Sequence, residues 1–181
     1  MSKLNYSRIP ITEMIFALPA DTWQVRLVPD DDHNALPVLS PTYTTGQLIN
    51  AVGFLRLKNM EGYHIYGRPD TFRHVLVDDL DEDAIDQLVT DGLRPALGVR
   101  TSKGNYQARI TLSEDEIEPD IAKAAARILA QRYNGDLGSA DAYHVGRLPG
   151  FTNRKGIYWT ERGYPFTGLY GQVFRGVAPG A

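Results

Sequence analysis

The sequence contains no cysteine, and this absence excludes several kinds of site at once. A disulfide framework, a cysteine nucleophile and a thiolate zinc site all depend on that residue. Long apolar runs are also missing: residues 1–5 lack the apolar stretch of a signal peptide, and no segment is long enough to span a membrane. These absences are compatible with a reducing compartment, and we expect a cytoplasmic protein without a membrane partner.

An excess of basic residues is missing as well. The 19 Lys and Arg against 22 Asp and Glu give a net charge of -3, whereas large non-specific nucleic-acid binders are basic. The charges are unevenly distributed, with seven acidic and no basic residues over 78–91, and five basic residues against Glu161 alone after Tyr143. This pattern suits a site that holds metal on one side and phosphates on the other, although two solvated faces explain it equally well.

Apolar periodicity divides the 181 residues into strand and helix patterns within one domain. Alternating or continuous apolar runs predict strands over 23–28, 38–40, 63–66, 75–77, 96–100, 106–112, 157–159 and 169–174. Helical spacing predicts helices over 45–58, 84–89 and 121–133, with an irregular arm or a short helix over 12–18. Together these patterns predict an α+β domain with a mainly antiparallel sheet backed by helices.

Two local signals sharpen the element boundaries. The Gly67-Arg68-Pro69 run predicts a break directly after the strand over 63–66. Ser113 and Glu116 have the spacing of a capping box, and Pro119 suits the first turn of the helix that follows.

The strand pattern over 75–77 ends in two adjacent aspartates, Asp78 and Asp79. Like charges a few ångströms apart repel each other, and a divalent cation, which prefers oxygen ligands, removes that cost. Because neighbouring residues of a regular strand point to opposite faces, the pair can share a metal only if the strand ends or bulges there. Asp79 as a helix-capping residue explains the pair without a metal, so both interpretations stay open on these residues alone.

Two further segments carry residues that suit phosphate or metal binding. The turn over 101–105 offers Ser102, Lys103 and backbone N–H groups to a phosphate, although it is also good hairpin chemistry. Asp136 follows a helix stop and could supply a third metal oxygen, with Asp141 as the competing candidate. A turn or a cap explains either aspartate without a function.

A third segment, 144–155, is basic and rich in glycine. Arg147, Arg154 and Lys155 lie close together in the sequence, with Phe151 between them. Basic side chains interleaved with an aromatic residue fit a nucleotide or single-strand site.

The order and spacing of these runs resemble one family. The distinctive runs are Asp78-Asp79, Thr101-Ser102 through Asn105-Tyr106-Gln107, Asp136, and Arg147-Leu148-Pro149-Gly150-Phe151-Thr152-Asn153-Arg154-Lys155. Over 43–155 they resemble the RepB-type plasmid primases, a branch of the archaeo-eukaryotic primase superfamily that is also found fused to mobilisation relaxases. The resemblance implies a primase-polymerase catalytic core on an RRM-like sheet, with an N-terminal α/β unit. We accordingly divide one domain, 1–181, into that unit over 1–62, the catalytic motifs over 63–155, and C-terminal strands or a tail over 156–181.

The resemblance also implies which residues hold the metal. Its first motif supplies two carboxylates, which fall on Asp78 and Asp79. Its third motif supplies one more, which by spacing falls on Asp136, with Asp141 as the second choice. Those three aspartates are the expected catalytic residues, with Mg²⁺ or Mn²⁺ as the expected cofactor.

A second set of residues is expected to bind the incoming nucleotide. The family's second motif is usually Ser-x-His, and here the matching hairpin has Ser102 and ends in Gln107, so the histidine is replaced. The full expected set is Ser102, Lys103, Gln107, His144, Arg147, Arg154 and Lys155. Tyr106, Phe151 and Trp159 could stack template or incoming bases, with core packing the expected role of at least one of them.

The activity implied by the resemblance is that of a DNA primase, which makes short primers on single-stranded DNA by two-metal nucleotidyl transfer. Such a protein would start plasmid or mobile-element replication. The expected partners are single-stranded DNA and nucleoside triphosphates, with a replicative helicase or a relaxase as candidates and a monomer as the default state. Nothing after Lys155 has the pattern of the helical C-terminal domain that family members commonly carry.

Two other functions compete with this one. A non-catalytic replication-initiation module would bind single-stranded origin DNA through its basic residues and would need no metal. The retained aspartates argue against it. A relaxase-like nuclease needs a histidine cluster, and the four histidines here form no His-x-His pair.

Overall fold

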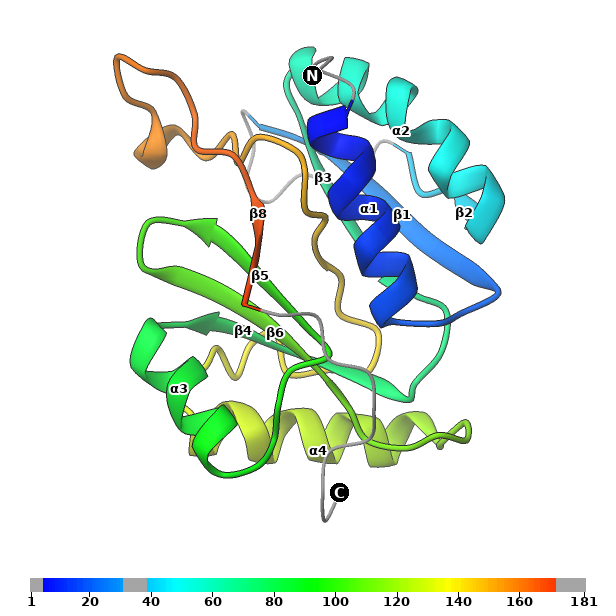
Figure 1. Cartoon of the computed structure of the whole chain (residues 1–181), viewed down its shortest axis with the longest axis vertical. Helices are drawn as coiled ribbons and strands as arrows, with labels where there is room; N and C mark the ends of the chain where they lie inside the picture. Colours follow the sequence, from blue (N-terminus) through cyan, green and yellow to red (C-terminus); the bar gives the residue numbers. More distant parts are fainter. Residues whose placement is uncertain (1–4, 31–38, 172–181) are drawn as a thin grey trace.

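Two four-stranded antiparallel sheets, each covered by helices, make up the computed structural model, which describes residues 5–30 and 39–171 (Figure 1). The first sheet has the strand order β2-β1-β3-β7 and the second has the order β4-β6-β5-β8. The α+β class and the antiparallel pairing predicted from the sequence are therefore confirmed. Within the described residues, no helix combines the length and apolar character needed to cross a membrane.

The first sheet is built mainly from the N-terminal part of the chain. Its strands are β1 (Thr22–Pro29), β2 (Thr42–Thr44), β3 (Tyr63–Pro69) and β7 (Gly146–Arg147). Helices α1 (Asn5–Ala17) and α2 (Thr45–Met60) lie side by side on one face of it (Figure 1). Strand β1 alternates buried and half-buried residues, because its inward side chains Trp23, Val25 and Leu27 pack against these helices.

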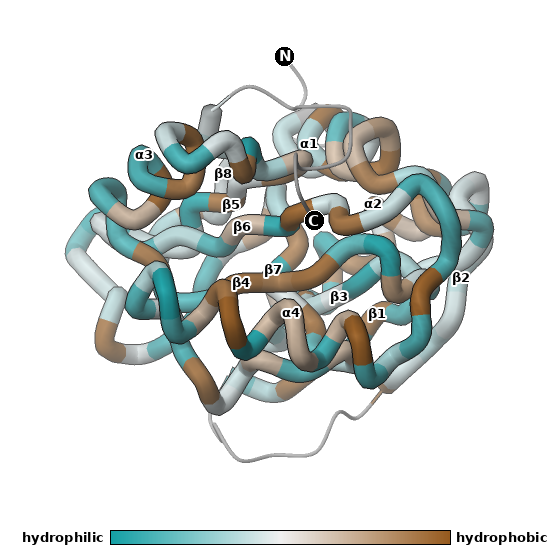
Figure 2. The backbone as a smooth tube through the Cα atoms, turned by 90° about the horizontal axis from the view of Figure 1, so that it is seen from below, coloured by the Kyte–Doolittle hydropathy of each residue, from teal (hydrophilic) through white to brown (hydrophobic). Residues whose placement is uncertain are grey.

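The second sheet carries the paired aspartates. Its strands are β4 (His74–Leu80), β5 (Leu97–Ser102), β6 (Asn105–Thr111) and β8 (Gly168–Tyr170), and its helices are α3 (Glu82–Thr90) and α4 (Pro119–Arg132). Figure 2 shows the hydrophobic part of β4, with α4 next to it. The apolar side of α4, with Ala122, Ala126 and Leu129, packs into this core.

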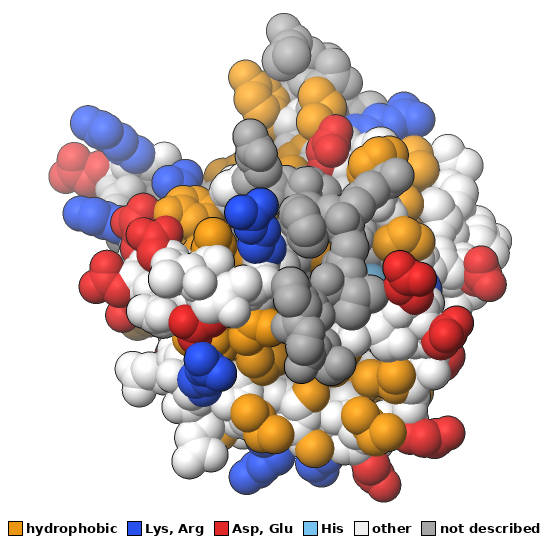
Figure 3. Space-filling model, turned by 60° about the horizontal axis from the view of Figure 1, so that its bottom comes forward, with side chains coloured by type: hydrophobic (Ala, Val, Ile, Leu, Met, Phe, Trp, Pro, Cys, Tyr) orange, Lys and Arg blue, Asp and Glu red, His pale blue; other side chains and the backbone are white. Residues whose placement is uncertain are grey.

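The outer face of α4 exposes Ile121 and Ile128. Figure 3 shows the hydrophobic side chains on this side of the molecule in small groups, with charged side chains among and around them. Scattered exposed apolar residues of this kind are ordinary on a soluble surface, so we assign this face no function.

Two predicted boundary signals were wrong. Strand β3 continues through Gly67-Arg68-Pro69, which pair with β1, and a side chain at Gly67 would meet Leu148 at 2.9 Å. The glycine thus permits close packing of Leu148 rather than ending the strand.

The predicted capping box of Ser113 and Glu116 is absent, because the Glu116 carboxylate accepts hydrogen bonds from Thr71 Oγ1 and the Phe72 N–H. The helix itself begins at Pro119, as expected.

The remaining differences lie near the two ends of the chain. The N-terminal helix is longer than the short helix expected over 12–18. Leu39 forms only an isolated bridge with Leu27, and Val38 lies outside the described residues. The segment predicted as a strand over 157–159 contains a 3-10 helix, Gly156–Tyr158, and residues 172–174 of the last predicted strand also lie outside the described residues.

Candidate active site

A polar cavity of about 180 Å³ lies where the two sheets meet. It receives side chains from β3 and β7 of the first sheet and from β4, β5 and β6 of the second. The residues that line it are Tyr66, Asp78, Asp79, Thr101, Asn105, Gln107, Asp136, Arg147, Asn153, Lys155 and Tyr158. The acidic and the basic segments of the sequence therefore meet at one place.

A bulge at the end of β4 lets both adjacent aspartates line the cavity. The register with β6 shifts between Val77 and Leu80, and Asp79 has a φ of 61°, in the left-handed region that non-glycine residues rarely occupy. The Asp79 N–H donates to Asp78 Oδ1 at 2.7 Å, and Asn105 Nδ2 donates to Asp79 Oδ1. These bonds hold a conformation that costs about 1–3 kcal/mol, and such strain is concentrated at functional sites.

A close backbone contact brings the third aspartate to the same strand end. The Asp136 N–H donates to the Asp78 carbonyl at 3.0 Å. Asn134 has a φ of 54°, and a side chain at Gly135 would meet the same carbonyl oxygen at 2.8 Å. The Asn-Gly pair that ends α4 is therefore what allows the chain to turn directly onto β4.

The competing candidate, Asp141, is placed differently. Its carboxylate forms an ion pair with Lys123 at 3.1 Å and accepts a hydrogen bond from the Tyr143 N–H at 2.9 Å. These contacts hold the pKa of Asp141 below its usual range, with the hydrogen bond from Tyr143 as the largest cause. Asp141 is not among the residues that line the cavity.

Gln107 connects the acidic and basic sides of the cavity through its single amide group. Its Nε2 donates to Asp78 Oδ1 at 2.8 Å, and its Oε1 accepts the Arg147 N–H at 2.9 Å. A side chain at Gly146 would approach this Oε1 to 3.0 Å, so the neighbouring glycine gives the amide its space. Both polar atoms of Gln107 have a protein partner, which makes it a positioning residue as well as a predicted nucleotide ligand.

Arg147 presents a buried cation to the cavity. Its Nη1 bonds to His64 Nδ1 at 3.0 Å, and its guanidinium lies over the Tyr66 ring at 4.8 Å. Within the described residues, Nη2 has no hydrogen-bond partner. Burial is also the main cause that lowers the pKa of Arg147. A desolvated guanidinium with a free N–H group favours an anionic partner such as a phosphate.

The other predicted nucleotide ligands are spread over different environments. Lys155 lines the cavity, whereas Lys103 is exposed in the β5–β6 turn. Ser102 is buried, and its Oγ has no hydrogen-bond partner among the described residues. His144 is half-buried; burial lowers its pKa, and the nearby carboxylates of Asp78 and Asp136 act in the opposite direction.

Arg154 has a partner elsewhere in the structure. Its Nε donates to Asp30 Oδ2, and its guanidinium lies over the Tyr164 ring at 4.9 Å. It does not line the cavity, so its expected contact with a nucleotide stays a prediction.

The sequence reasoning missed five residues that line the cavity: Tyr66, Thr101, Asn105, Asn153 and Tyr158. Asn105 had a usable signal, because it lies two residues before Gln107 and so shares a face of β6 with it. Asn153 donates from Nδ2 to the Thr101 carbonyl at 2.9 Å. This contact joins two segments far apart in the sequence and had no local signal.

The donor set fits a divalent cation in kind. Asp78, Asp79 and Asp136 supply the carboxylate oxygens that Mg²⁺ and Mn²⁺ prefer. Asn105 and Gln107 hold one oxygen of each paired aspartate, and within the described residues the other oxygen accepts no hydrogen bond. In the described part of the chain no three acidic or imidazole side chains are close enough together to hold a metal ion as they stand, so the three carboxylates share a cavity but do not form one metal site.

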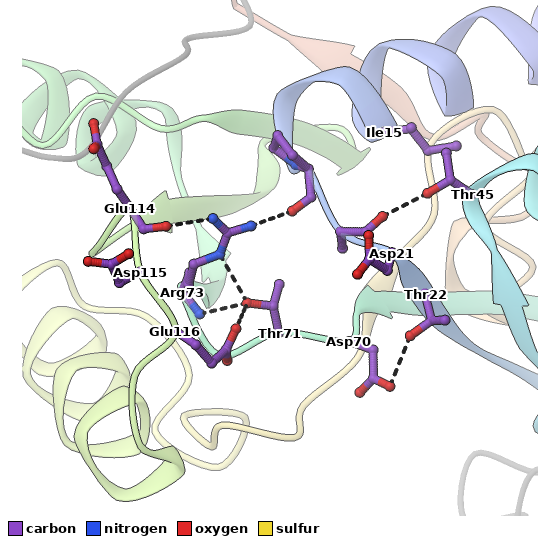
Figure 4. A pocket seen from close by; sticks show the side chains of 12 residues that line it. Ile15, Asp21, Thr22, Thr45, Asp70, Thr71, Arg73, Glu114, Asp115 and Glu116 are labelled. Carbon is purple, nitrogen blue, oxygen red and sulfur yellow. Dashed lines mark hydrogen bonds between the residues drawn. The ribbon is translucent and has the colours of Figure 1, made fainter.

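A second, larger cavity of about 680 Å³ lies on another part of the boundary between the sheets (Figure 4). Five acidic residues line it: Asp21, Asp70, Glu114, Asp115 and Glu116. Arg73 crosses it, donating to the carbonyl oxygens of Glu114 and Pro19, both at 2.7 Å. Asp70 accepts hydrogen bonds from Thr22 and Gln24 of β1. These contacts join the α1–β1, β3–β4 and β6–α4 connections.

The fold matches that of a known class of protein. The crystal structure of the catalytic domain of primase RepB′ in complex with initiator DNA superposes with a TM-score of 0.86 at 28% identity. The match covers 96% of this chain and 88% of that one.

Sequence comparison identifies the family. The model of the RepB DNA-primase N-terminal domain matches residues 47–171, and the chain belongs to that family. This confirms the resemblance drawn from the aspartate, hairpin and Arg-Leu-Pro-Gly runs.

Two curated relatives are much longer than the segment they share with this chain. Mobilization protein A of Escherichia coli is 41% identical over 134 residues, which cover 67% of this chain and 19% of the relative. A DNA primase of Acidithiobacillus ferrooxidans is 36% identical over 109 residues, which cover 58% of this chain and 31% of the relative. The chain thus corresponds to between a fifth and a third of these relatives.

Proposed function

We propose that this chain is the catalytic core of a DNA primase, which joins nucleotides into short primers on single-stranded DNA. The observation that carries the proposal is the small cavity, where three aspartates face Arg147 and Lys155. The family membership, the relative named DNA primase and the structural relative solved with initiator DNA support it. Replication of a plasmid or another mobile element is the process that such a core serves, and the relative named Mobilization protein A supports that setting.

Asp78, Asp79 and Asp136 would hold two divalent cations, Mg²⁺ or Mn²⁺. Such cations supply activation of the attacking 3′-hydroxyl and stabilisation of the charge on the leaving pyrophosphate. Asn105 and Gln107 each donate a hydrogen bond to one oxygen of a paired carboxylate, and these bonds would orient the carboxylates for the cations.

Arg147 and Lys155 bind the triphosphate on the opposite side. The free Nη2 of Arg147 donates to a phosphate oxygen, and Lys155 adds a second positive charge to the same cavity. Gln107 sets the distance between the two sides, because it bonds to the Asp78 carboxylate and to the Arg147 backbone at once. The protein acts by positioning and electrostatics, and no side chain forms a covalent intermediate.

Primer synthesis on circular single-stranded DNA tests the proposal. The assay contains all nucleoside triphosphates with Mg²⁺ or Mn²⁺, and it compares the wild type with Asp78→Asn. We expect short products from the wild type alone, and none when a chelator removes the cation. A second reaction starts from a pre-annealed primer, which separates polymerisation from initiation.

The competing function, a non-catalytic module that binds single-stranded origin DNA, gives a different set of results. It predicts tight binding of single strands, no extension of the annealed primer, and no effect of Asp78→Asn on binding. That combination would contradict the proposal.

A further inference from the structure

One exposed segment next to the cavity has no role in the chemistry proposed above. Residues 156–166, which we call the 156–166 loop, begin with the 3-10 helix Gly156–Tyr158 and return to the body just before β8. Figure 1 shows this loop in orange, extending beyond the body on the side where the β5–β6 turn also lies. Its exposed residue Trp159 directly follows Tyr158, which lines the cavity.

The loop exposes three large apolar side chains alongside the polar residues Thr160, Glu161 and Arg162. Ile157 is 79% exposed, Trp159 is 59% exposed and Phe166 is 43% exposed. Of the three residues expected to stack on bases, Tyr106 and Phe151 are buried in the two cores, and only Trp159 is open to a ligand. These three side chains differ from the scattered isoleucines of α4 because they lie on one short loop that also contributes Tyr158 to the cavity.

The same short helix also faces the catalytic cavity. Tyr158 lines the cavity, as does Lys155, which caps the helix, whereas Ile157 and Trp159 on either side of Tyr158 are turned to solvent. A strand that leaves the cavity along this loop therefore meets Trp159 within one residue of the cavity wall. The exposed apolar side chains thus continue the site rather than forming a separate patch.

The base of the loop is held in place by buried hydrogen bonds. The Asn153 N–H donates to the Pro165 carbonyl at 2.8 Å, and Thr152 pairs with Phe166. Thr167, which is 1% exposed, donates from Oγ1 to the carbonyl oxygens of Leu148 and Phe151. Because these hydrogen bonds fix the backbone at the base of the loop, less conformational entropy is lost when a ligand binds to the exposed side chains.

The charges around the loop select the kind of partner. Lys155 and Arg162 lie in or beside it against Glu161, while Arg100 and Lys103 are exposed on the neighbouring hairpin. Strand β8, which follows the loop, pairs Gly168 with Arg100 and so brings that hairpin alongside. Aromatic side chains with interleaved cations bind single-stranded nucleic acid, since bases stack on the rings and phosphates meet the cations.

We propose that the 156–166 loop is the docking platform for the single-stranded DNA template, with a base stacked on Trp159 and supported by Ile157. This inference rests on the proposed primase function for the identity of the strand, but its binding test needs neither metal nor nucleotide. The two proposals can therefore fail separately.

Trp159 makes the test direct, because the chain has two tryptophans and the other, Trp23, is 1% exposed in the first core. Oligo-dT, which has no secondary structure of its own, is titrated into the full chain while tryptophan emission is recorded. We expect quenching that saturates with the oligonucleotide. Trp159→Phe should remove the quenching and keep the affinity within about threefold, since phenylalanine still stacks.

Trp159→Ala should weaken binding of oligo-dT about 5- to 150-fold, the range that follows from the loss of one base–aromatic stack. Ile157→Ser should weaken it less, and Phe54→Ala, an exposed aromatic of α2, should leave it unchanged. In primer extension Trp159→Ala should raise the KM for the template and leave the KM for the nucleotide unchanged.

Equal affinity of Trp159→Ala and wild type for oligo-dT, or the absence of any quenching on binding, would overturn the inference. A wild type that binds and is quenched but extends no primer would contradict the primase proposal and leave the template platform standing.

Discussion

The two acidic cavities of this molecule differ in how their carboxylates are used. The larger cavity is lined by five acidic residues. Two of them, Asp70 and Glu116, accept hydrogen bonds that join loops. Arg73 donates its N–H groups to backbone carbonyl oxygens and to Thr71. In the smaller one, neutral amides hold one oxygen of each paired aspartate and leave the other open.

Neither the size of a cavity nor its number of acidic residues therefore identifies a functional site. The larger cavity has nearly four times the volume, about 680 Å³ against about 180 Å³. Its hydrogen bonds and charged side chains hold the connecting loops of the two sheets together. The smaller cavity contains the strained Asp79 and the Nη2 of Arg147, which has no hydrogen-bond partner among the described residues, and both have a cost that folding alone does not explain.

Removal of the third carboxylate of the smaller cavity should have the largest effect on activity. Asp136→Asn should lower primer synthesis on the order of 1,000-fold, because metal stabilisation of the transition state is worth several kcal/mol. The matched control is Asp141→Asn, which breaks an ion pair with Lys123 outside the cavity. Rates per folded molecule decide between them, and a larger loss in the control would assign the third ligand to Asp141.

The next effect is a dependence of the free energy of unfolding on pH, caused by His74 at the start of β4. Burial is the main cause that lowers the pKa of His74 to about 4, so the folded protein keeps this imidazole neutral where the unfolded chain protonates it near pH 6.5. The stabilisation is complete above pH 6.5 and is lost as the pH falls toward 4, by about 3 kcal/mol in total.

Denaturant unfolding of the wild type and of His74→Gln, measured between pH 7 and pH 4, checks this prediction. As the pH falls, the free energy of unfolding should decrease more steeply for the wild type than for the variant. The difference in slope should correspond to at most one additional proton bound by the unfolded wild-type chain. Parallel curves for the two proteins would show that His74 titrates normally in the folded state.

A smaller loss of activity is expected when the side chain of Gln107, which bonds to both Asp78 and Arg147, is removed. Gln107→Ala frees the Asp78 carboxylate and leaves the Arg147 N–H without its acceptor. We expect the rate of primer extension to fall about 10- to 100-fold, the usual effect of removing an outer partner of a metal ligand. Both kcat and the KM for the nucleotide should change, because one side chain orients both sides; an effect on KM alone would make Gln107 a simple nucleotide ligand.

The smallest effect on activity belongs to the larger cavity. Glu116→Ala removes the acceptor for Thr71 and for the Phe72 N–H, and should lower the free energy of unfolding by about 1 kcal/mol. Primer synthesis per folded molecule should stay within twofold of the wild type. A specific loss of activity without a change in stability would give the larger cavity a functional role.

Much of the fold was predictable, because its signals are local. The alternation of β1, the Thr44 cap of α2 and the apolar spacing of α4 all appear in short windows of sequence. The break expected at Gly67 failed because the same glycine can end a strand or admit a neighbouring side chain, and only the packing of Leu148 decides. The division of the strands between two sheets has no local signal, and β7, the two-residue edge strand of the first sheet, has no periodicity to detect.

The candidate site was predictable in its residue types and less so in its geometry. Asp78, Asp79, Asp136, Arg147 and Lys155 line one cavity, and the condition that β4 must bulge for the first two to share a ligand is met. The double use of Gln107 and the pairing of Arg154 with Asp30 arise from contacts between distant segments, which no local pattern encodes.

The most direct test compares one residue of each cavity in the same assay. Asp79→Asn and Glu116→Ala are measured beside the wild type for primer synthesis on circular single-stranded DNA and for denaturant unfolding. We expect that Asp79→Asn makes no primers and unfolds no earlier than the wild type, while Glu116→Ala makes primers at the normal rate and unfolds earlier. Normal primer synthesis by Asp79→Asn would show that the small cavity is not the catalytic one.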